Sequence, residues 1–376
     1  MMVTQFVPDT DRPDAGTTSA RRADGDVLHV TGLTVEYVTD GDPVRACADV
    51  TFTLRRGEIL GVAGESGSGK STLITALTRL QRPPAVTTGG SIVFYPRDGG
   101  PAIDLVTATP KALRALRWTS LSIVLQSAMD ALNPVMRLGA QFADALRTHD
   151  RTLTKDAAWA RAAELLATVG ISGDRARSYP HELSGGMRQR ASIALALACG
   201  PELVVMDEPT TAVDVVMQRQ ILAQVLRLRR TLGFAVVFVT HDLSLLLELA
   251  DRIAIMYAGR IVELGTAREL YDDPRHPYTR GLRDSFPPLH APLTRLTGIP
   301  GTPPDLRRPP SGCPFHPRCP QRFAGCDTDL PELVTKGGHS VACRLHEPTG
   351  RPDPVPDPAS GPASGPASAR TEGGAS

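Results

Sequence analysis

Residues 64–72 read Gly-Glu-Ser-Gly-Ser-Gly-Lys-Ser-Thr, a complete match to the pattern G-x-x-x-x-G-K-[ST]. A mostly apolar run at 58–63 precedes this stretch and has the length of a buried strand, whereas residues 73–77 read as a helix. A strand, a glycine-rich turn and a helix form the context in which this pattern binds phosphate. The glycines let several backbone N–H groups face one point, and the opening helix adds its positive end. We expect Lys70 to reach the β- and γ-phosphates of a nucleotide and Ser71 to ligate Mg²⁺.

The composition of the 376-residue chain is that of an ordinary globular protein, with 41% hydrophobic and 22% charged residues. Its apolar runs all fall short of the roughly 20 residues that cross a bilayer. The polar first 25 residues lack the apolar core of a secretion signal. We therefore expect a cytosolic protein or one on the cytosolic face of a membrane. The net charge of +1 gives no overall field for binding nucleic acid.

A second motif is the run 203–208, Leu-Val-Val-Met-Asp-Glu, a hydrophobic strand that ends in two carboxylates. Carboxylates at a buried strand end need a partner, because unpaired buried charges are costly. Asp207 can hold Mg²⁺ and Glu208 can polarise an attacking water. The alternative is a solvated pair of carboxylates at a helix N-terminus near Pro209.

A third motif is the run 183–190, Leu-Ser-Gly-Gly-Met-Arg-Gln-Arg, which opens a helix that extends to about residue 198. Two adjacent glycines weaken a helix interior, so they suit a helix start whose free N–H groups receive an anion. The alternative is that Ser184 is an ordinary N-cap.

In this order, the three motifs resemble the nucleotide-binding subunit of an ABC transporter. The resemblance covers residues 27–285, and Met187 departs from the glutamine that usually ends the Leu-Ser-Gly-Gly-Gln signature. It implies an α/β fold: a P-loop NTPase of the ABC ATPase type with a mixed sheet. An inserted α-helical subdomain is expected at about 127–190, together with a small cysteine-containing C-terminal extension. The domain organisation is then a disordered tail at 1–26, the ATPase domain at 27–285, the extension at 286–349 and a disordered tail at 350–376.

The resemblance also assigns roles to single residues. Glu208, His241 and Gln126 become the catalytic group: Glu208 the base, His241 the switch histidine on the γ-phosphate, and Gln126 the glutamine that contacts Mg²⁺ or water. Ser71, Gln126 and Asp207 would hold Mg²⁺. A capped turn for Gln126, a helix-cap neighbour for His241 and a core aromatic for Tyr37 are the alternatives. The positions assigned to nucleotide are Tyr37, Gly64, Glu65, Ser66, Gly67, Ser68, Gly69, Lys70, Ser71, Thr72, Gln126, Ser184, Gly185, Gly186, Asp207, Asp214 and His241.

Three further stretches, at 131–136, 179–190 and 276–280, resemble the dipeptide/oligopeptide importer ATPases. Ser127-Ala128 stands where those proteins usually have Asp-Pro, so the loop that faces the permease is expected to differ. The implied function is ATP hydrolysis that drives peptide import from the cytoplasmic face of the cell membrane. Uptake of nickel chelates or another small solute is an alternative, and a soluble ABC ATPase of DNA repair or translation is a more distant one.

The resemblance implies partners as well. A second ABC ATPase subunit, either homologous or a copy of this chain, would place its own signature over the ATP held by residues 64–72. Two transmembrane permease subunits and, through them, an extracytoplasmic solute-binding protein complete the assembly, and nucleic acid is not expected. The implied cofactors are ATP and Mg²⁺.

Four cysteines cluster near the C-terminus with the spacing C-x5-C-x6-C-x16-C: Cys313, Cys319, Cys326 and Cys343. Four thiolates can hold zinc or an iron–sulfur cluster, but the C-x2-C pairs of zinc ribbons are missing. Structural disulfides are not expected in the cytosol. The resemblance to peptide-importer subunits favours a [4Fe–4S] cluster, with zinc and no metal as the alternatives.

Overall fold

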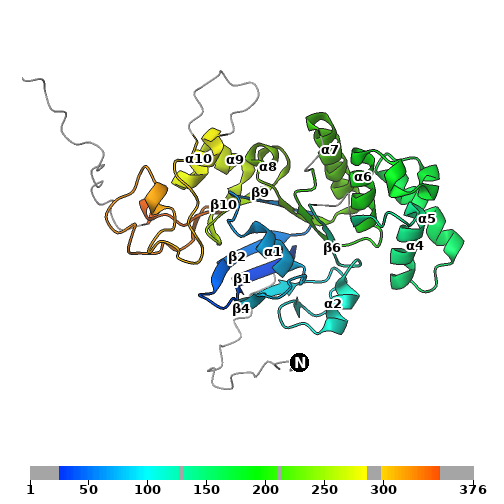
Figure 1. The fold of residues 1–376 in the computed structure, drawn as a ribbon, viewed down its shortest axis with the longest axis horizontal. Coiled ribbons are helices and arrows are strands. Elements are labelled where there is room, and N and C mark those ends of the chain that lie inside the picture. Colours follow the sequence, from blue (N-terminus) through cyan, green and yellow to red (C-terminus); the bar gives the residue numbers. More distant parts are fainter. Residues whose placement is uncertain (1–24, 127–130, 211–213, 286–297, 348–376) are drawn as a thin grey trace, which may run out of the picture.

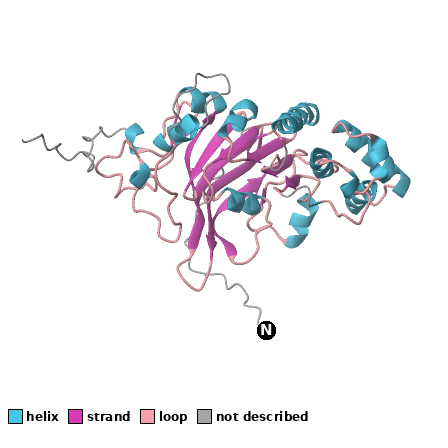
Figure 2. Cartoon of the chain, turned by 45° about the horizontal axis from the view of Figure 1, so that its top comes forward, coloured by secondary structure: helices cyan, strands magenta, loops and turns pink. Residues whose placement is uncertain are grey.

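The structure, a computed structural model, describes residues 25–126, 131–210, 214–285 and 298–347. These residues form a large mixed sheet, a smaller antiparallel sheet and helices around both (Figures 1 and 2). A helical lobe lies at one end of the molecule and the C-terminal extension at the other (Figure 1). None of the helices in this part of the chain combines the length and apolar character that a bilayer crossing requires.

The large sheet has eight strands in the order β11-β12-β10-β9-β3-β8-β7-β6. The strands from β9 to β6 are parallel neighbours, whereas β10, β12 and β11 pair antiparallel. β3 and β8 are buried along their whole length, as expected for parallel strands covered on both faces. The strands are β3 (Ile59–Ala63), β6 (Leu121–Val124), β7 (Leu203–Asp207), β8 (Ala235–Val239), β9 (Arg252–Tyr257), β10 (Arg260–Thr266), β11 (Val334–Lys336) and β12 (His339–Val341).

The small sheet has the order β2-β1-β4-β5 and is antiparallel throughout. Its strands are β1 (Asp26–Tyr37), β2 (Val44–Arg55), β4 (Ala85–Phe94) and β5 (Ile103–Asp104). Two adjacent glycines usually weaken a strand, but Gly89 and Gly90 both lie inside β4. Gly90 has a φ of +82°, and a Cβ there would lie 2.5 Å from the backbone of Gly32 on β1. The two glycines therefore allow a close strand approach at a register shift instead of ending the strand.

The helices cover the two sheets and build the lobe. Leu73 and Ile74 of α1 belong to the core cluster that contains residues of both sheets. In the lobe, α4 and α5 lie inside the stretch at about 127–190 for which a helical subdomain is expected. The helices are α1 (Lys70–Leu77), α2 (Pro110–Leu116), α4 (Leu138–His149), α5 (Lys155–Thr168), α6 (Gly185–Ala196), α7 (Val215–Leu232), α8 (Leu243–Leu249), α9 (Ala267–Asp272) and α10 (Pro277–Ser285).

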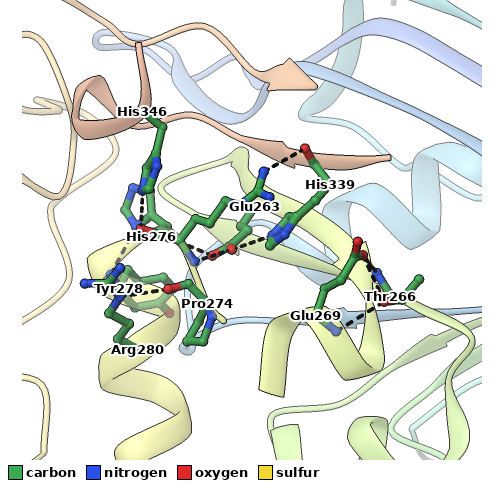
Figure 3. Close-up of polar contacts among 10 residues, drawn as sticks. Glu263, Thr266, Glu269, Pro274, His276, Tyr278, Arg280, His339 and His346 are labelled. Carbon is green, nitrogen blue, oxygen red and sulfur yellow. Dashed lines mark hydrogen bonds and ion pairs between the residues drawn. The ribbon is translucent and has the colours of Figure 1, made fainter. Parts of the chain in front are cut away.

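The C-terminal extension joins the large sheet through β12, which pairs with β10. Glu263 on β10 is fully buried and accepts hydrogen bonds from His339 Nε2 at 2.7 Å and from the backbone N–H groups of Arg275 and His276 (Figure 3). Burial alone would raise the pKa of Glu263, but these hydrogen bonds lower it overall. His346 on the extension also contacts the backbone oxygen of Arg275. The extension is thus tied to the large sheet by buried polar contacts, which the sequence did not predict.

Candidate active site

The site lies along the edge of the large sheet where its parallel strands end. β3 ends before the glycine-rich loop at 64–69, and β6 ends two residues before Gln126. β7 ends at Asp207 and is followed by Glu208, whereas β8 ends two residues before His241. Because the four strands are parallel and adjacent, their carboxyl ends meet at one edge, where α/β sheets bind ligands.

The glycine-rich loop has the geometry that the sequence predicts. Gly64 has a φ of +152°, and a Cβ there would lie 2.2 Å from the carbonyl oxygen of Met256. Gly69 has a φ of +101° and is the N-cap of α1 without any side-chain cap. The first N–H groups of this helix are therefore not capped by a side chain, as an anion-binding helix end requires.

Lys70 is only 8% exposed and folds back into the loop. Its Nζ donates to the carbonyl oxygens of Gly64 at 2.7 Å and Glu65 at 2.9 Å. Burial lowers the pKa of Lys70, and the nearby carboxylates of Glu208, Asp207 and Glu65 oppose this effect. The ammonium group is therefore held at the centre of the loop by backbone carbonyl oxygens.

The three residues predicted to be catalytic are in contact, with Glu208 between Gln126 and His241. Its Oε2 accepts a hydrogen bond from Gln126 Nε2 at 3.1 Å, and its Oε1 lies 3.1 Å from His241 Nδ1. The backbone of Glu208 has a φ of +43°, which is unfavourable for a residue with a side chain, and its N–H donates to Val239 at 2.9 Å. A strained residue held in place at a strand end is typical of a functional site.

Asp207 is the last residue of β7 and lies beside Glu208. Burial raises the pKa of Asp207, Glu208 raises it further, and Lys70 opposes both. A divalent cation here would remove this penalty, because it favours the ionised carboxylate. The oxygen atoms of Asp207, Ser71 and Gln126 are hard donors of the kind that Mg²⁺ prefers.

The signature residues and Asp214 have local roles in the isolated chain. Ser184 caps α6 by accepting from the N–H of Met187 at 3.3 Å, and Asp214 caps α7 by accepting from the N–H of Met217 at 2.9 Å. A Cβ on Gly186 would lie 2.5 Å from the sulfur of Met217, so this glycine lets α6 and α7 approach closely. The contacts of one chain alone therefore match the N-cap alternative.

Two positions near the loop add information that the sequence did not give. The Tyr37 hydroxyl lies 3.1 Å from Thr72 Oγ1, so Tyr37 is close to α1, and its assignment to the nucleotide stays a prediction. Glu65 of the loop contacts Arg318 and Tyr278, which are far away in sequence and carry no signal for this role. The predicted departure at Ser127-Ala128 lies outside the described residues.

The phosphate loop, the paired carboxylates of β7 and the capped α6 together define an ATPase of the ABC type. The ABC transporter family matches residues 47–211, and the C-terminal region of oligopeptide/dipeptide transporters matches residues 262–326. The dipeptide transport ATP-binding protein DppD of Bacillus subtilis is 42% identical over 325 residues, 85% of this chain and 95% of the relative. The oligopeptide transport ATP-binding protein OppD of the same organism is 44% identical over 293 residues, 77% of this chain and 80% of the relative.

Among solved structures, the chain is similar to a dimeric ATP-binding cassette in a post-hydrolysis state with bound ADP and Pi. The identity is 26% and the TM-score 0.56, with 64% of this chain and 99% of that chain covered. The chain belongs to the ABC transporter ATP-binding proteins, in the group that carries the oligopeptide/dipeptide C-terminal region. The predicted ABC ATPase fold, with its mixed sheet and helices, and the predicted ATPase class are thereby confirmed, whereas the cysteine-containing extension stays a prediction.

Proposed function

We propose that this protein is the ATP-hydrolysing subunit of an importer for dipeptides or oligopeptides. The convergence of Gln126, Glu208 and His241 at one sheet edge, beside the phosphate loop, supports the hydrolytic role. The match to the oligopeptide/dipeptide C-terminal region and the relatives named for peptide transport support the cargo class. Nickel chelates or another small solute, and a soluble role in DNA repair or translation, are the competing functions.

In the proposed mechanism each of these residues has its own step in hydrolysis. The loop N–H groups and Lys70 bind the triphosphate, and Ser71, Gln126 and Asp207 would hold Mg²⁺, which would neutralise phosphate charge. Glu208 accepts a hydrogen bond from Gln126 and contacts His241, and these two neighbours hold its carboxylate in place. Glu208 orients and polarises the attacking water, and His241 donates a hydrogen bond to the γ-phosphate. The position of Gln126 depends on whether a nucleotide is bound.

The second half of the site comes from another ATPase subunit. Ser184, Gly185 and Gly186 at the start of α6, together with Asp214, cover the nucleotide held by the partner's loop, and the partner is a homologous chain or a second copy. The start of α6 suits this role, since a helix N-terminus attracts phosphate. The dimeric state of the similar cassette structure agrees with such an arrangement.

Two permease subunits and an extracytoplasmic solute-binding protein complete the transporter, with this chain at the cytoplasmic face of the membrane. In this arrangement residues 27–285 form the ATPase domain, residues 286–349 the extension, and 1–26 and 350–376 its tails. The exposed Gln126 loop and the helical lobe at about 127–190 transmit closure of the ATPase dimer to the permeases as a rigid-body switch.

The test is transport by the complete assembly. The chain is co-expressed with its cognate permeases and binding protein and reconstituted in vesicles with labelled dipeptides, oligopeptides and nickel chelates. ATP-dependent accumulation of peptide supports the proposal. Accumulation of a nickel chelate alone, or recovery of the chain on ribosomes or DNA instead of permeases, contradicts it.

The four cysteines of the extension line one small cavity of about 20 Å³, together with His276. Burial raises the pKa of Cys319 to about 11 and that of Cys343 to about 12, so both are neutral thiols here. Among the described residues no set of three His, Cys, Asp or Glu side chains has the geometry of a metal site. The cavity has room for about one water molecule, so a cluster requires the surrounding turns to move outward.

The donor set nevertheless fits an iron–sulfur cluster, and we include a [4Fe–4S] cluster in the proposal. The fully buried His276 supports it: Nδ1 accepts from the N–H of Tyr278 at 3.0 Å, so Nε2 carries the proton, yet Nε2 has no partner among the described residues. A buried N–H donor on a residue that lines the same cavity as the four cysteines is suited to bonding a thiolate or sulfide. The sulfurs of Cys313, Cys319, Cys326 and Cys343 would be the ligands, and the bound cluster would cross-link the turns that carry them.

A further inference from the structure

Glu65, the second residue of the phosphate loop, is held by a residue of the C-terminal extension. The guanidinium group of Arg318 donates to both carboxylate oxygens, from Nη1 to Oε2 at 2.7 Å and from Nη2 to Oε1 at 3.0 Å. The side chain of Arg318 is 6% exposed and that of Glu65 26% exposed. A bidentate pair of this kind, largely shielded from water, fixes the orientation of both groups.

The backbone of Glu65 is held from the same side. Its N–H donates to the hydroxyl oxygen of Tyr278 at 2.8 Å, and Tyr278 is fully buried at the start of α10. The carbonyl oxygen of Glu65 meanwhile accepts from Lys70. Side chain, N–H and C=O of this one loop residue thus each have a defined partner, two of them outside the loop.

The arginine itself is fixed in position. Its Nε donates to the carbonyl oxygen of Pro300 at 2.7 Å, and its guanidinium carbon lies 5.8 Å from the ring centre of Tyr257 and 6.0 Å from that of Phe315. Phe315 and Tyr278 also pack against each other, with ring centres 5.4 Å apart. The extension therefore presents a rigid guanidinium to the loop instead of a mobile surface charge.

The charge of Glu65 acts on the nucleotide site. Its carboxylate is one of three whose charge opposes the effect of burial on the pKa of Lys70. Without a partner, this carboxylate would repel a triphosphate that binds beside Lys70. Arg318 supplies a compensating positive charge and holds the carboxylate by two hydrogen bonds.

We propose that Arg318 and Tyr278 are positioning residues of the nucleotide site, which set the conformation and charge of the phosphate loop through Glu65. The C-terminal extension then contributes to nucleotide binding by the ATPase domain, in addition to packing against it. The proposal rests on nucleotide binding by the loop and is independent of the transported solute and of any metal at the cysteines.

The first test compares two arginine variants of the full chain. Arg318→Met is expected to raise the Kd of a fluorescent ATP analogue about tenfold, as for a shielded charge pair that loses one partner. Arg344→Met is the matched control, because Arg344 pairs with Asp329 inside the extension at 2.5 Å and does not contact the loop. Equal Kd values for both variants and the wild type would overturn the proposal.

The second test separates positioning from loss of folding. Arg318→Met leaves the Glu65 charge unpaired, so adding Glu65→Gln should recover most of the lost affinity, and Arg318→Lys should recover less. The loss should also be larger for ATP than for AMP, because it acts through phosphate charge. A general folding defect would weaken the binding of both nucleotides equally and would not be relieved by Glu65→Gln.

Tyr278→Phe, which removes only the hydroxyl group, should weaken ATP binding by about threefold while preserving the ring packing.

Discussion

His241 Nδ1 lies 3.1 Å from Glu208 Oε1, although the two residues are 33 positions apart in the chain. They follow the ends of β8 and β7, which are adjacent parallel strands, so the sheet itself creates this contact. Gln126, from the end of β6, occupies the second oxygen of the same carboxylate. Gln126 and His241 both hold the carboxylate of Glu208. We therefore expect each of them to affect hydrolysis in two ways, by orienting Glu208 and by contacting the nucleotide.

Glu208→Gln should retain ATP binding but reduce steady-state ATP hydrolysis by about 100-fold or more, since an amide does not accept a proton from the attacking water. The variant should also trap the closed dimer with ATP bound. Phosphate release and size-exclusion chromatography with ATP measure the two effects. Glu202→Gln is the control, because Glu202 pairs with Arg56 near the other end of β7. Full hydrolysis by Glu208→Gln would reject Glu208 as the catalytic base.

His241→Ala should lower kcat about tenfold with a smaller change in KM, because the imidazole acts on the γ-phosphate and on the orientation of Glu208. In the Glu208→Gln background the same substitution should cost little more, since residues that act as one unit are not additive. A double-mutant cycle on kcat measures the coupling. Additive losses would show that the 3.1 Å contact has no role in catalysis.

Lys70→Ala should abolish tight nucleotide binding, not only hydrolysis. The ammonium group is the one cation at the centre of the loop among the described contacts, and its loss leaves the charges of Asp207 and Glu208 unopposed there. Equilibrium binding of a fluorescent ATP analogue should weaken by about 100-fold. Lys111→Ala, on the exposed face of α2, is the control and should bind like the wild type.

Removal of a cysteine tests the metal proposal. Anaerobically purified protein should contain iron and sulfide and show a broad charge-transfer absorption, and Cys326→Ser should lose both. Cys199→Ser is the matched control, since Cys199 lies far from the cavity in sequence and packs against the main core. A stoichiometric zinc content, or no metal in protein prepared without oxygen, would contradict the cluster.

The sequence predicted those parts of the site that are local or that follow from a parallel sheet. Residues 64–72 predict the loop by themselves, and the strand ends at Gln126, Asp207 and His241 predict that the catalytic side chains meet. The contact between Glu65 and Arg318 was not predictable, because 253 residues separate them and neither has a distinctive pattern. The pairing of β12 with β10 was not predictable either, because β12 has only three residues, too few for a periodic pattern.

The buried His276 predicts a pH dependence of stability. Burial lowers its pKa to about 4, with Glu263 opposing the effect and His346 and Arg280 adding to it. The pKa in the unfolded chain is about 6.5, so the unfolded state takes up the proton first as the pH falls. The contribution of neutral His276 to stability is therefore complete above pH 6.5 and is lost as the pH falls towards the folded pKa. Between these two pH values the free energy of unfolding of the wild type should fall by on the order of 3 kcal/mol from this group alone.

Denaturant unfolding measures this effect. The free energy of unfolding of His276→Gln should fall less between pH 7 and pH 4.5, whereas that of the exposed-site variant His181→Gln should follow the wild type. Parallel curves for all three proteins would show that the His276 ring is not held neutral by the fold.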